Sequence, residues 1–156
     1  MFGAMTRVSG MKTGILRAQS RPDFRHIRNW VFDLDNPLYD AGNGVFSQIE
    51  SRMTDYVSGF LGLARDQARR RQKELYHRYG TTLNGLMREH GCDADHYLNY
   101  VHDIDLSGLA ADAALRDAVE KLPGRRFIFT NGCRVHAARI LERLEMAHLF
   151  ESVWDI

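Results

Sequence analysis

Short apolar runs alternate with longer amphipathic stretches from residue 29 onward. Three runs have the pattern of buried parallel strands, over residues 30–32, 126–129 and 150–156. Two helical patterns flank the second run, over residues 112–122 and 133–146. Strand, helix and strand in this order predict a parallel sheet and an α/β fold.

The stretch over residues 45–105 is predicted to be entirely helical and to interrupt the α/β pattern after the first strand. Apolar residues recur there at spacings of three and four, and we interpret these stripes as packing surfaces rather than ligand-binding ones. Four helices are expected, over residues 46–60, 65–79, 83–90 and 93–102. We therefore divide the chain into a core of residues 29–44 and 106–156 and a helical insertion of residues 45–105.

Composition and charge exclude few classes of function. The chain has 156 residues, of which 44% are hydrophobic and 26% are charged, as is typical of one globular domain with a small insertion. Lys and Arg total 21 against 20 for Asp and Glu, so the net charge favours neither nucleic acid nor a membrane as a partner. No apolar run approaches the roughly 18 residues that span a bilayer, and we expect a soluble, cytoplasmic protein.

Residues 1–28 differ from the rest, because they hold six basic residues and one acidic residue. We interpret this leader as a disordered extension, with a targeting peptide or an arm that binds nucleic acid as the alternatives. The two cysteines, Cys92 and Cys133, are far apart and form no CxxC pair. Neither a disulfide framework nor a zinc site is therefore indicated.

Two carboxylates, Asp33 and Asp35, directly follow the first apolar run. If the chain turns between them, Asp33 can attack a phosphorus atom while Asp35 protonates the leaving oxygen and later deprotonates water. Carboxylate oxygens are ligands that Mg²⁺ prefers, and a cation offsets the repulsion between phosphate and two acids. We therefore expect a magnesium-dependent phosphoryl-transfer site in which both aspartates are catalytic and bind the metal.

Thr130 ends the second apolar run directly before a helix. Its hydroxyl and the amides that follow can donate to phosphate oxygens. The same residues also suit an ordinary strand-to-helix turn with an N-cap, so this element alone leaves both interpretations open.

Together these elements resemble the haloacid dehalogenase (HAD) superfamily of phosphatases. Residues 32–39 are similar to its first motif and residues 127–132 to its second. A narrower resemblance, to the pyrimidine 5′-nucleotidase branch, rests on residues 79–83, Gly85-Leu86, His90, residues 100–103 and His136-Ala137. The similarity covers about residues 29–156.

The resemblance implies a Rossmann-like core with a helical cap inserted after the first strand. It implies hydrolysis of a nucleoside monophosphate through an aspartyl-phosphate on Asp33. Asp35 takes the acid and base role and binds Mg²⁺ through its backbone carbonyl. The remaining roles that it implies are phosphate binding by Thr130, Asn131 and Gly132, and substrate contact in the cap by Gly80, Thr81 and Thr82.

Two departures from the family pattern qualify this expectation. Pro37 stands where the family usually has Thr, and proline removes a backbone donor from that turn. The family's third motif, a Lys, and its fourth, an acidic pair, follow the strand that begins near Phe150, whereas the chain ends at Ile156. We therefore expect a truncated chain with impaired activity and weak magnesium binding.

Truncation also has a consequence for the sheet, because it leaves residues 29–32 as an exposed apolar edge. We expect a poorly stable monomer, a homo-oligomer that covers this edge, or a chain shortened by a frameshift or premature stop. The alternative function, from a different class, is a non-catalytic remnant that binds phosphate or a protein partner.

Overall fold

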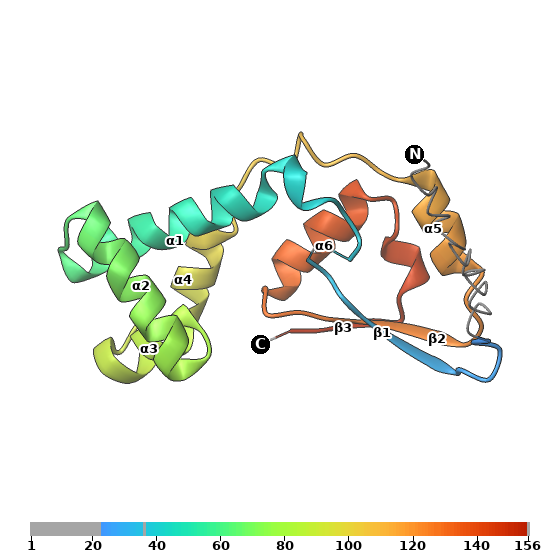
Figure 1. The fold of residues 1–156 in the computed structure, drawn as a ribbon, viewed down its shortest axis with the longest axis horizontal. Helices are drawn as coiled ribbons and strands as arrows, with labels where there is room; N and C mark the ends of the chain where they lie inside the picture. Colours follow the sequence, from blue (N-terminus) through green and yellow to red (C-terminus); the bar gives the residue numbers. More distant parts are fainter. Residues whose placement is uncertain (1–22, 36, 156) are drawn as a thin grey trace, which may run out of the picture.

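Figure 1 shows the computed structural model of the chain, which describes residues 23–35 and 37–155. The predicted α/β fold is confirmed, because a three-stranded parallel sheet carries a helical insertion after its first strand. Most of the basic leader lies outside the described residues, so its interpretation stays a prediction. Within the part of the chain that the structure describes, no helix has the length and apolar character needed to cross a membrane.

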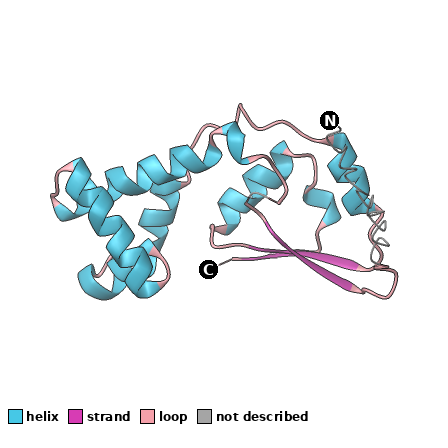
Figure 2. Cartoon of the chain, in the orientation of Figure 1, coloured by secondary structure: helices cyan, strands magenta, loops and turns pink. Residues whose placement is uncertain are grey.

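The sheet has the strand order β1-β2-β3, with all strands parallel. The strands are β1 (Asn29–Asp33), β2 (Arg125–Phe129) and β3 (Ser152–Trp154). Asp33 pairs with Phe129, and Phe129 pairs with Trp154. Because the carboxyl ends of parallel strands share one edge of a sheet, the residues that follow β1 and β2 meet there. Figure 2 shows this edge turned toward the helical insertion.

One face of the sheet is covered by helices α5 (Ala113–Glu120) and α6 (Arg134–Arg143), as Figure 1 shows. Phe32, Ile128 and Val153 belong to the apolar core on this face. Helix α6 is shorter than predicted because Glu145 adopts a left-handed conformation, with a φ of 58°, which helices do not tolerate. A short 3₁₀ helix, η2 (Ala147–Leu149), then leads into β3.

The opposite face of the sheet carries exposed apolar side chains. Val31, Phe129 and Trp154 are 63%, 52% and 58% exposed. Strand β1 pairs with β2 alone among the described residues, so the expected unpaired edge is present there. We call the surface formed by Val31, Phe129 and Trp154 the open face.

The insertion contains four helices, and their bounds lie close to the predicted ones. They are α1 (Val45–Leu61), α2 (Arg65–Tyr79), α3 (Thr82–His90) and α4 (Ala94–Val101). A 3₁₀ helix, η1 (Ala41–Asn43), precedes α1 where only a turn was expected. The four helices enclose an apolar core of their own, centred on Val57, Leu75 and Leu86, which is distinct from the core beneath the sheet.

Not every residue of the apolar stripes is buried among the helices of the insertion. Phe46, Phe60 and Tyr76 are 45%, 43% and 56% exposed. The reason is that Phe46 and Tyr76 line a cavity between the insertion and the sheet. Phe60 lies near the end of α1, where its ring stacks on Tyr56 at 5.7 Å.

Two sets of hydrogen bonds hold the base of the insertion: one joins its two ends, and the other joins it to the core. The side-chain amide of Gln48 donates to the Asp105 carbonyl at 2.9 Å, and the Asp105 amide donates back to Gln48 Oε1 at 2.9 Å. Arg139 of α6 donates to the carbonyls of His102 and Ile104, both at 2.9 Å. These contacts fix the returning chain next to the point where the insertion begins.

Candidate active site

A cavity of about 350 Å³ lies between the insertion and the carboxyl edge of the sheet. Every site residue predicted from the sequence except Thr130 lines it. The core contributes Asp33, Asp35, Asn131 and Gly132, and the insertion contributes Gly80, Thr81 and Thr82. Residues far apart in the sequence therefore share one cavity.

The two aspartates face the cavity because the residue between them is buried in the core. Asp33 is the last residue of β1 and is exposed. Leu34 is fully buried, and Asp35 follows in a turn with its side chain 21% exposed. The hydroxyl of Tyr39 donates to Asp35 Oδ1, and Nε2 of His136 lies 3.8 Å from the same oxygen. Asp33 is thus the more exposed carboxylate, whereas Asp35 is held by the contacts with Tyr39 and His136.

These neighbours determine the charge states. Burial raises the pKa of Asp35, but His136 and Tyr39 favour its ionised form, so the pKa lies below its ordinary value. Burial raises the pKa of Tyr39, and the charge of Asp35 raises it further. Tyr39 therefore stays protonated as a hydrogen-bond donor, and these contacts favour the ionised form of Asp35 while the cavity holds no substrate.

The turn after β2 is held by Thr130. The Thr130 side chain is buried, and its Oγ1 accepts a hydrogen bond from the Gly132 amide at 2.9 Å. The Thr130 amide donates to the Trp154 carbonyl at 3.0 Å. Asn131 is exposed at the tip of the turn. Thr130 therefore shapes the turn, whereas Asn131 presents its polar groups to the cavity.

The N-terminus of α6 is engaged by a carboxylate. The Arg134 amide donates to Asp155 Oδ2 at 2.9 Å, and the Arg134 guanidinium contacts Asp155 Oδ1 at 3.0 Å. Burial raises the pKa of Asp155, but Arg134 outweighs this effect and lowers it. An anionic ligand can use this helix terminus only in competition with Asp155.

On the insertion side, the hydroxyls of Thr81 and Thr82 differ in their ability to donate a hydrogen bond to a ligand. Thr82 donates to the Gln72 carbonyl at 3.3 Å, so its proton is engaged. Thr81 Oγ1 accepts from the Asn84 amide at 3.1 Å and thereby caps α3, which leaves the hydroxyl proton of Thr81 free to donate. Of the two, Thr81 is the better hydrogen-bond donor to a ligand.

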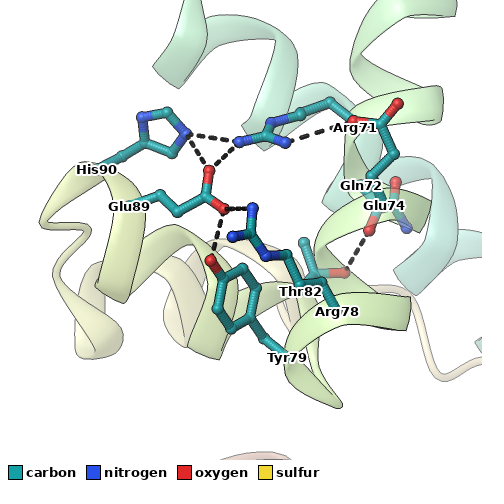
Figure 3. A network of polar contacts seen from close by, with 8 residues as sticks. All are labelled: Arg71, Gln72, Glu74, Arg78, Tyr79, Thr82, Glu89 and His90. Atoms are coloured by element: carbon teal, nitrogen blue, oxygen red, sulfur yellow. Dashed lines mark hydrogen bonds and ion pairs between the residues drawn. The ribbon is translucent and has the colours of Figure 1, made fainter.

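A polar network around Glu89 holds this turn in place (Figure 3). Glu89 of α3 accepts from Tyr79 at 2.7 Å and from Arg78 at 3.2 Å, and it also binds Arg71. The hydrogen bond from Tyr79, followed by the charges of the two arginines, keeps the pKa of Glu89 below its ordinary value against the opposing effect of burial. The network joins α2 to α3 and so fixes the Gly80 to Thr82 turn between them.

The rest of the insertion side is apolar. The main contributors are Phe46, Ile49, Met53, Tyr76, Tyr97, Leu98 and Val101. Neither lysine nor arginine lines the cavity in the described part of the chain. The cavity thus combines a polar end at the sheet with an apolar wall, an arrangement suited to a ligand with one charged group and a flat or apolar remainder.

The donor set fits a magnesium ion that is held by few protein ligands. Mg²⁺ typically binds one or two carboxylates and completes its shell with water and phosphate oxygens. Asp33 can supply a carboxylate, and Asp35 can supply its backbone carbonyl. Among residues 23–35 and 37–155, no group of three or more His, Cys, Asp or Glu side chains is arranged to hold a metal. The described residues therefore suit Mg²⁺ bound together with a phosphate ligand.

Sequence reasoning assigned no role to three side chains that surround Asp35. Tyr39 and His136 contact it, and His102 stacks on His136 with ring centroids 4.2 Å apart. All three fall within the stretches that carried the family resemblance. Their contacts depend on how the insertion docks on the core, and no local pattern encodes that.

No family model matches the chain. Phosphate metabolism protein 8 of Saccharomyces cerevisiae is 28% identical over 136 residues, which cover 80% of this chain and 42% of the yeast protein. The chain thus spans less than half the length of this curated relative.

Two solved structures also align with the chain. The HAD-hydrolase YfnB of Bacillus subtilis, described as bound to magnesium, has a TM-score of 0.44 and 16% identity over 82% of this chain and 64% of its own. The L-2-haloacid dehalogenase of Xanthobacter autotrophicus has a TM-score of 0.40 and 17% identity over 83% of this chain and 57% of its own.

Proposed function

We propose that the cavity is the active site of a HAD-type hydrolase that cleaves phosphate monoesters. One observation carries this proposal: the carboxylates that follow β1 share a cavity with the Asn131-Gly132 turn that follows β2. These are the positions that resemble the first two motifs of the superfamily. The name of the yeast relative refers to phosphate metabolism and supports a phosphate ester as the substrate.

The reaction has two steps. In the first, Asp35 is protonated with substrate bound. An Asp33 oxygen attacks phosphorus, the bond to the ester oxygen breaks, and that oxygen keeps the electron pair of the bond and receives the proton of Asp35. In the second, Asp35 removes a proton from water as the water oxygen attacks phosphorus. The bond to Asp33 then breaks, and inorganic phosphate leaves.

The residues around the cavity divide the other tasks. Asn131 and the amides of its turn donate to the phosphate oxygens. Tyr39 holds Asp35 by the hydrogen bond to Oδ1. Mg²⁺, when bound at Asp33 and Asp35, supplies positive charge that offsets the charge of the phosphate.

We propose a pyrimidine nucleoside monophosphate as the substrate. The sequence resemblance in residues 79–83 supports this choice, and so does the apolar wall of the cavity. The rings of Phe46 and Tyr76 suit contact with a flat base. Thr81 is the proposed hydrogen-bond donor to the nucleoside.

We expect slow turnover from this chain. No lysine or arginine of the described residues lines the cavity, so the phosphate charge there is balanced by the metal alone. The chain also spans only part of the length of the proteins that it matches. The activity of a whole protein of this kind is therefore itself a proposal for this chain.

The test is release of inorganic phosphate from uridine or cytidine monophosphate by the purified chain with Mg²⁺. Asp33→Asn removes the nucleophile, and EDTA removes the metal, so each is expected to abolish release. Asp95→Asn makes the same chemical change at an exposed position in α4 and serves as the control. Equal rates in wild type and Asp33→Asn would refute the enzyme and favour the non-catalytic alternative.

A further inference from the structure

His136 is a buried titratable side chain that the two-step reaction leaves without a role. Its side chain is fully buried in α6, and neither ring nitrogen has a hydrogen-bond partner among the described residues. Buried polar groups are nearly always paired, because an unpaired one loses its interaction with water without compensation. The polar atom that faces its Nε2 is Asp35 Oδ1, at 3.8 Å.

The His136 ring is held in its plane by groups from both the core and the insertion. His102, at the end of α4, stacks on it with ring centroids 4.2 Å apart and an interplanar angle of 17°. Cys133 Sγ lies 3.4 Å from His102 Nδ1 and fixes the second ring in turn. A Cβ atom added at Gly132 would lie 3.1 Å from His136 Cδ2, so the turn after β2 packs directly on the histidine pair.

Asp35 is therefore approached at one oxygen by two groups. Tyr39 donates to Oδ1, and His136 Nε2 faces the same oxygen. A separation of 3.8 Å exceeds that of a hydrogen bond, but catalytic contacts of this kind tighten when substrate binds. With Oδ1 engaged on this side, Oδ2 is the oxygen left to transfer a proton.

We infer that His136 is a positioning residue that orients the Asp35 carboxyl group so that Oδ2 delivers its proton to the ester oxygen. The inference rests on the proposed function. His102 keeps the imidazole in place by stacking, and the proton moves from Asp35 to the leaving oxygen as the phosphorus–oxygen bond breaks. His136 itself neither contacts the substrate nor exchanges a proton with it.

The test exploits the leaving group. Uridine monophosphate releases an alkoxide that must be protonated, whereas p-nitrophenyl phosphate releases a stable phenolate that needs little help from an acid. For both substrates, kcat/KM reports the steps up to the aspartyl-phosphate, which is where Asp35 acts as an acid. A residue that positions Asp35 affects the first substrate selectively.

His136→Asn and His136→Gln form a matched pair. Both remove the stacked ring, but the amide nitrogen of Gln reaches the position of Nε2, whereas that of Asn reaches only the position of Nδ1. In His136→Asn, we expect kcat/KM for uridine monophosphate to fall about 10-fold or more beyond any fall for p-nitrophenyl phosphate. In His136→Gln, the ratio of the two values returns to within about 3-fold of wild type. His148→Gln, an exposed histidine, leaves both values unchanged.

Equal losses on both substrates in His136→Asn, or the same ratio in both amide variants, would overturn the inference while leaving the phosphatase intact. Failure of both variants to fold, judged by circular dichroism, would assign His136 to core packing and overturn it as well. If the wild type itself shows no Asp33-dependent release from either substrate, the proposed function fails, and the positioning role fails with it.

Discussion

His102 lies where the insertion rejoins the core, and its environment opposes a positive charge. Burial first, and the neighbouring His136 second, lower the pKa of His102 from its ordinary value of 6.5 to about 4. The unfolded chain therefore binds this proton more tightly than the folded chain does. The contribution of His102 to stability is complete above pH 6.5 and declines as the pH falls from 6.5 towards 4.

The magnitude follows from the two pKa values. At about pH 5, an unfolded His102 is almost fully protonated and the folded one is mostly neutral, which corresponds to about 2 kcal/mol of lost unfolding free energy. The carboxylates with lowered pKa values, such as Asp35, lose their contribution only at lower pH. A loss of unfolding free energy between pH 6.5 and about 4 therefore distinguishes the effect of His102 from that of the carboxylates.

The assay is urea denaturation of wild type and His102→Gln at about pH 7.5 and about pH 5, followed by circular dichroism. Gln removes the titrating group, so the stability of the variant falls by about 2 kcal/mol less than that of wild type between the two pH values. His148→Gln keeps the dependence of wild type. An equal pH dependence in wild type and His102→Gln, or an NMR titration of folded His102 near pH 6.5, would contradict the reasoning.

Gly85→Ala places a Cβ atom 2.8 Å from the Leu75 side chain between α2 and α3, and we expect it to destabilise the chain by about 1–3 kcal/mol in thermal unfolding. Gly59→Ala in α1 has open space around the new atom and should stabilise the chain by up to about 1 kcal/mol; similar shifts in both would contradict the packing argument. Val31→Lys charges the open face at the edge strand β1, so sedimentation velocity should detect less self-association than in wild type, and unchanged association would exclude this part of the sheet as the interface.

The fold was predictable because its signals are local. The apolar runs that became β1 and β2 each end in polar residues, and a parallel sheet brings such ends to one edge whatever lies between them. The bounds of α2 matched the predicted range, since Gly80 follows its last residue in a conformation that ends a helix. Thr81 and Asp93 cap the two helices that follow, as such residues do in most helix starts.

The cavity was only partly predictable, because helical periodicity identifies an apolar face without saying what covers it. Phe46 and Val57 belong to the same stripe, yet Val57 is fully buried among helices and Phe46 lines the cavity. The surroundings of Asp35 depend on contacts between α6 and the end of α4, which are distant in the sequence. The docking of the insertion determines both features.

The reciprocal hydrogen bonds between Gln48 and Asp105 hold the two chain crossings to the insertion side by side. Chain ends that lie this close can be rejoined by a short linker. The insertion that covers the two aspartates can therefore be removed from the core that carries them. A core without the insertion would expose Asp33 to phosphate groups on proteins or polymers. In the intact chain, the insertion covers this edge of the sheet and leaves a cavity of about 350 Å³ that opens to solvent. For the proposed phosphatase, access to Asp33 therefore depends on a junction that lies outside the cavity.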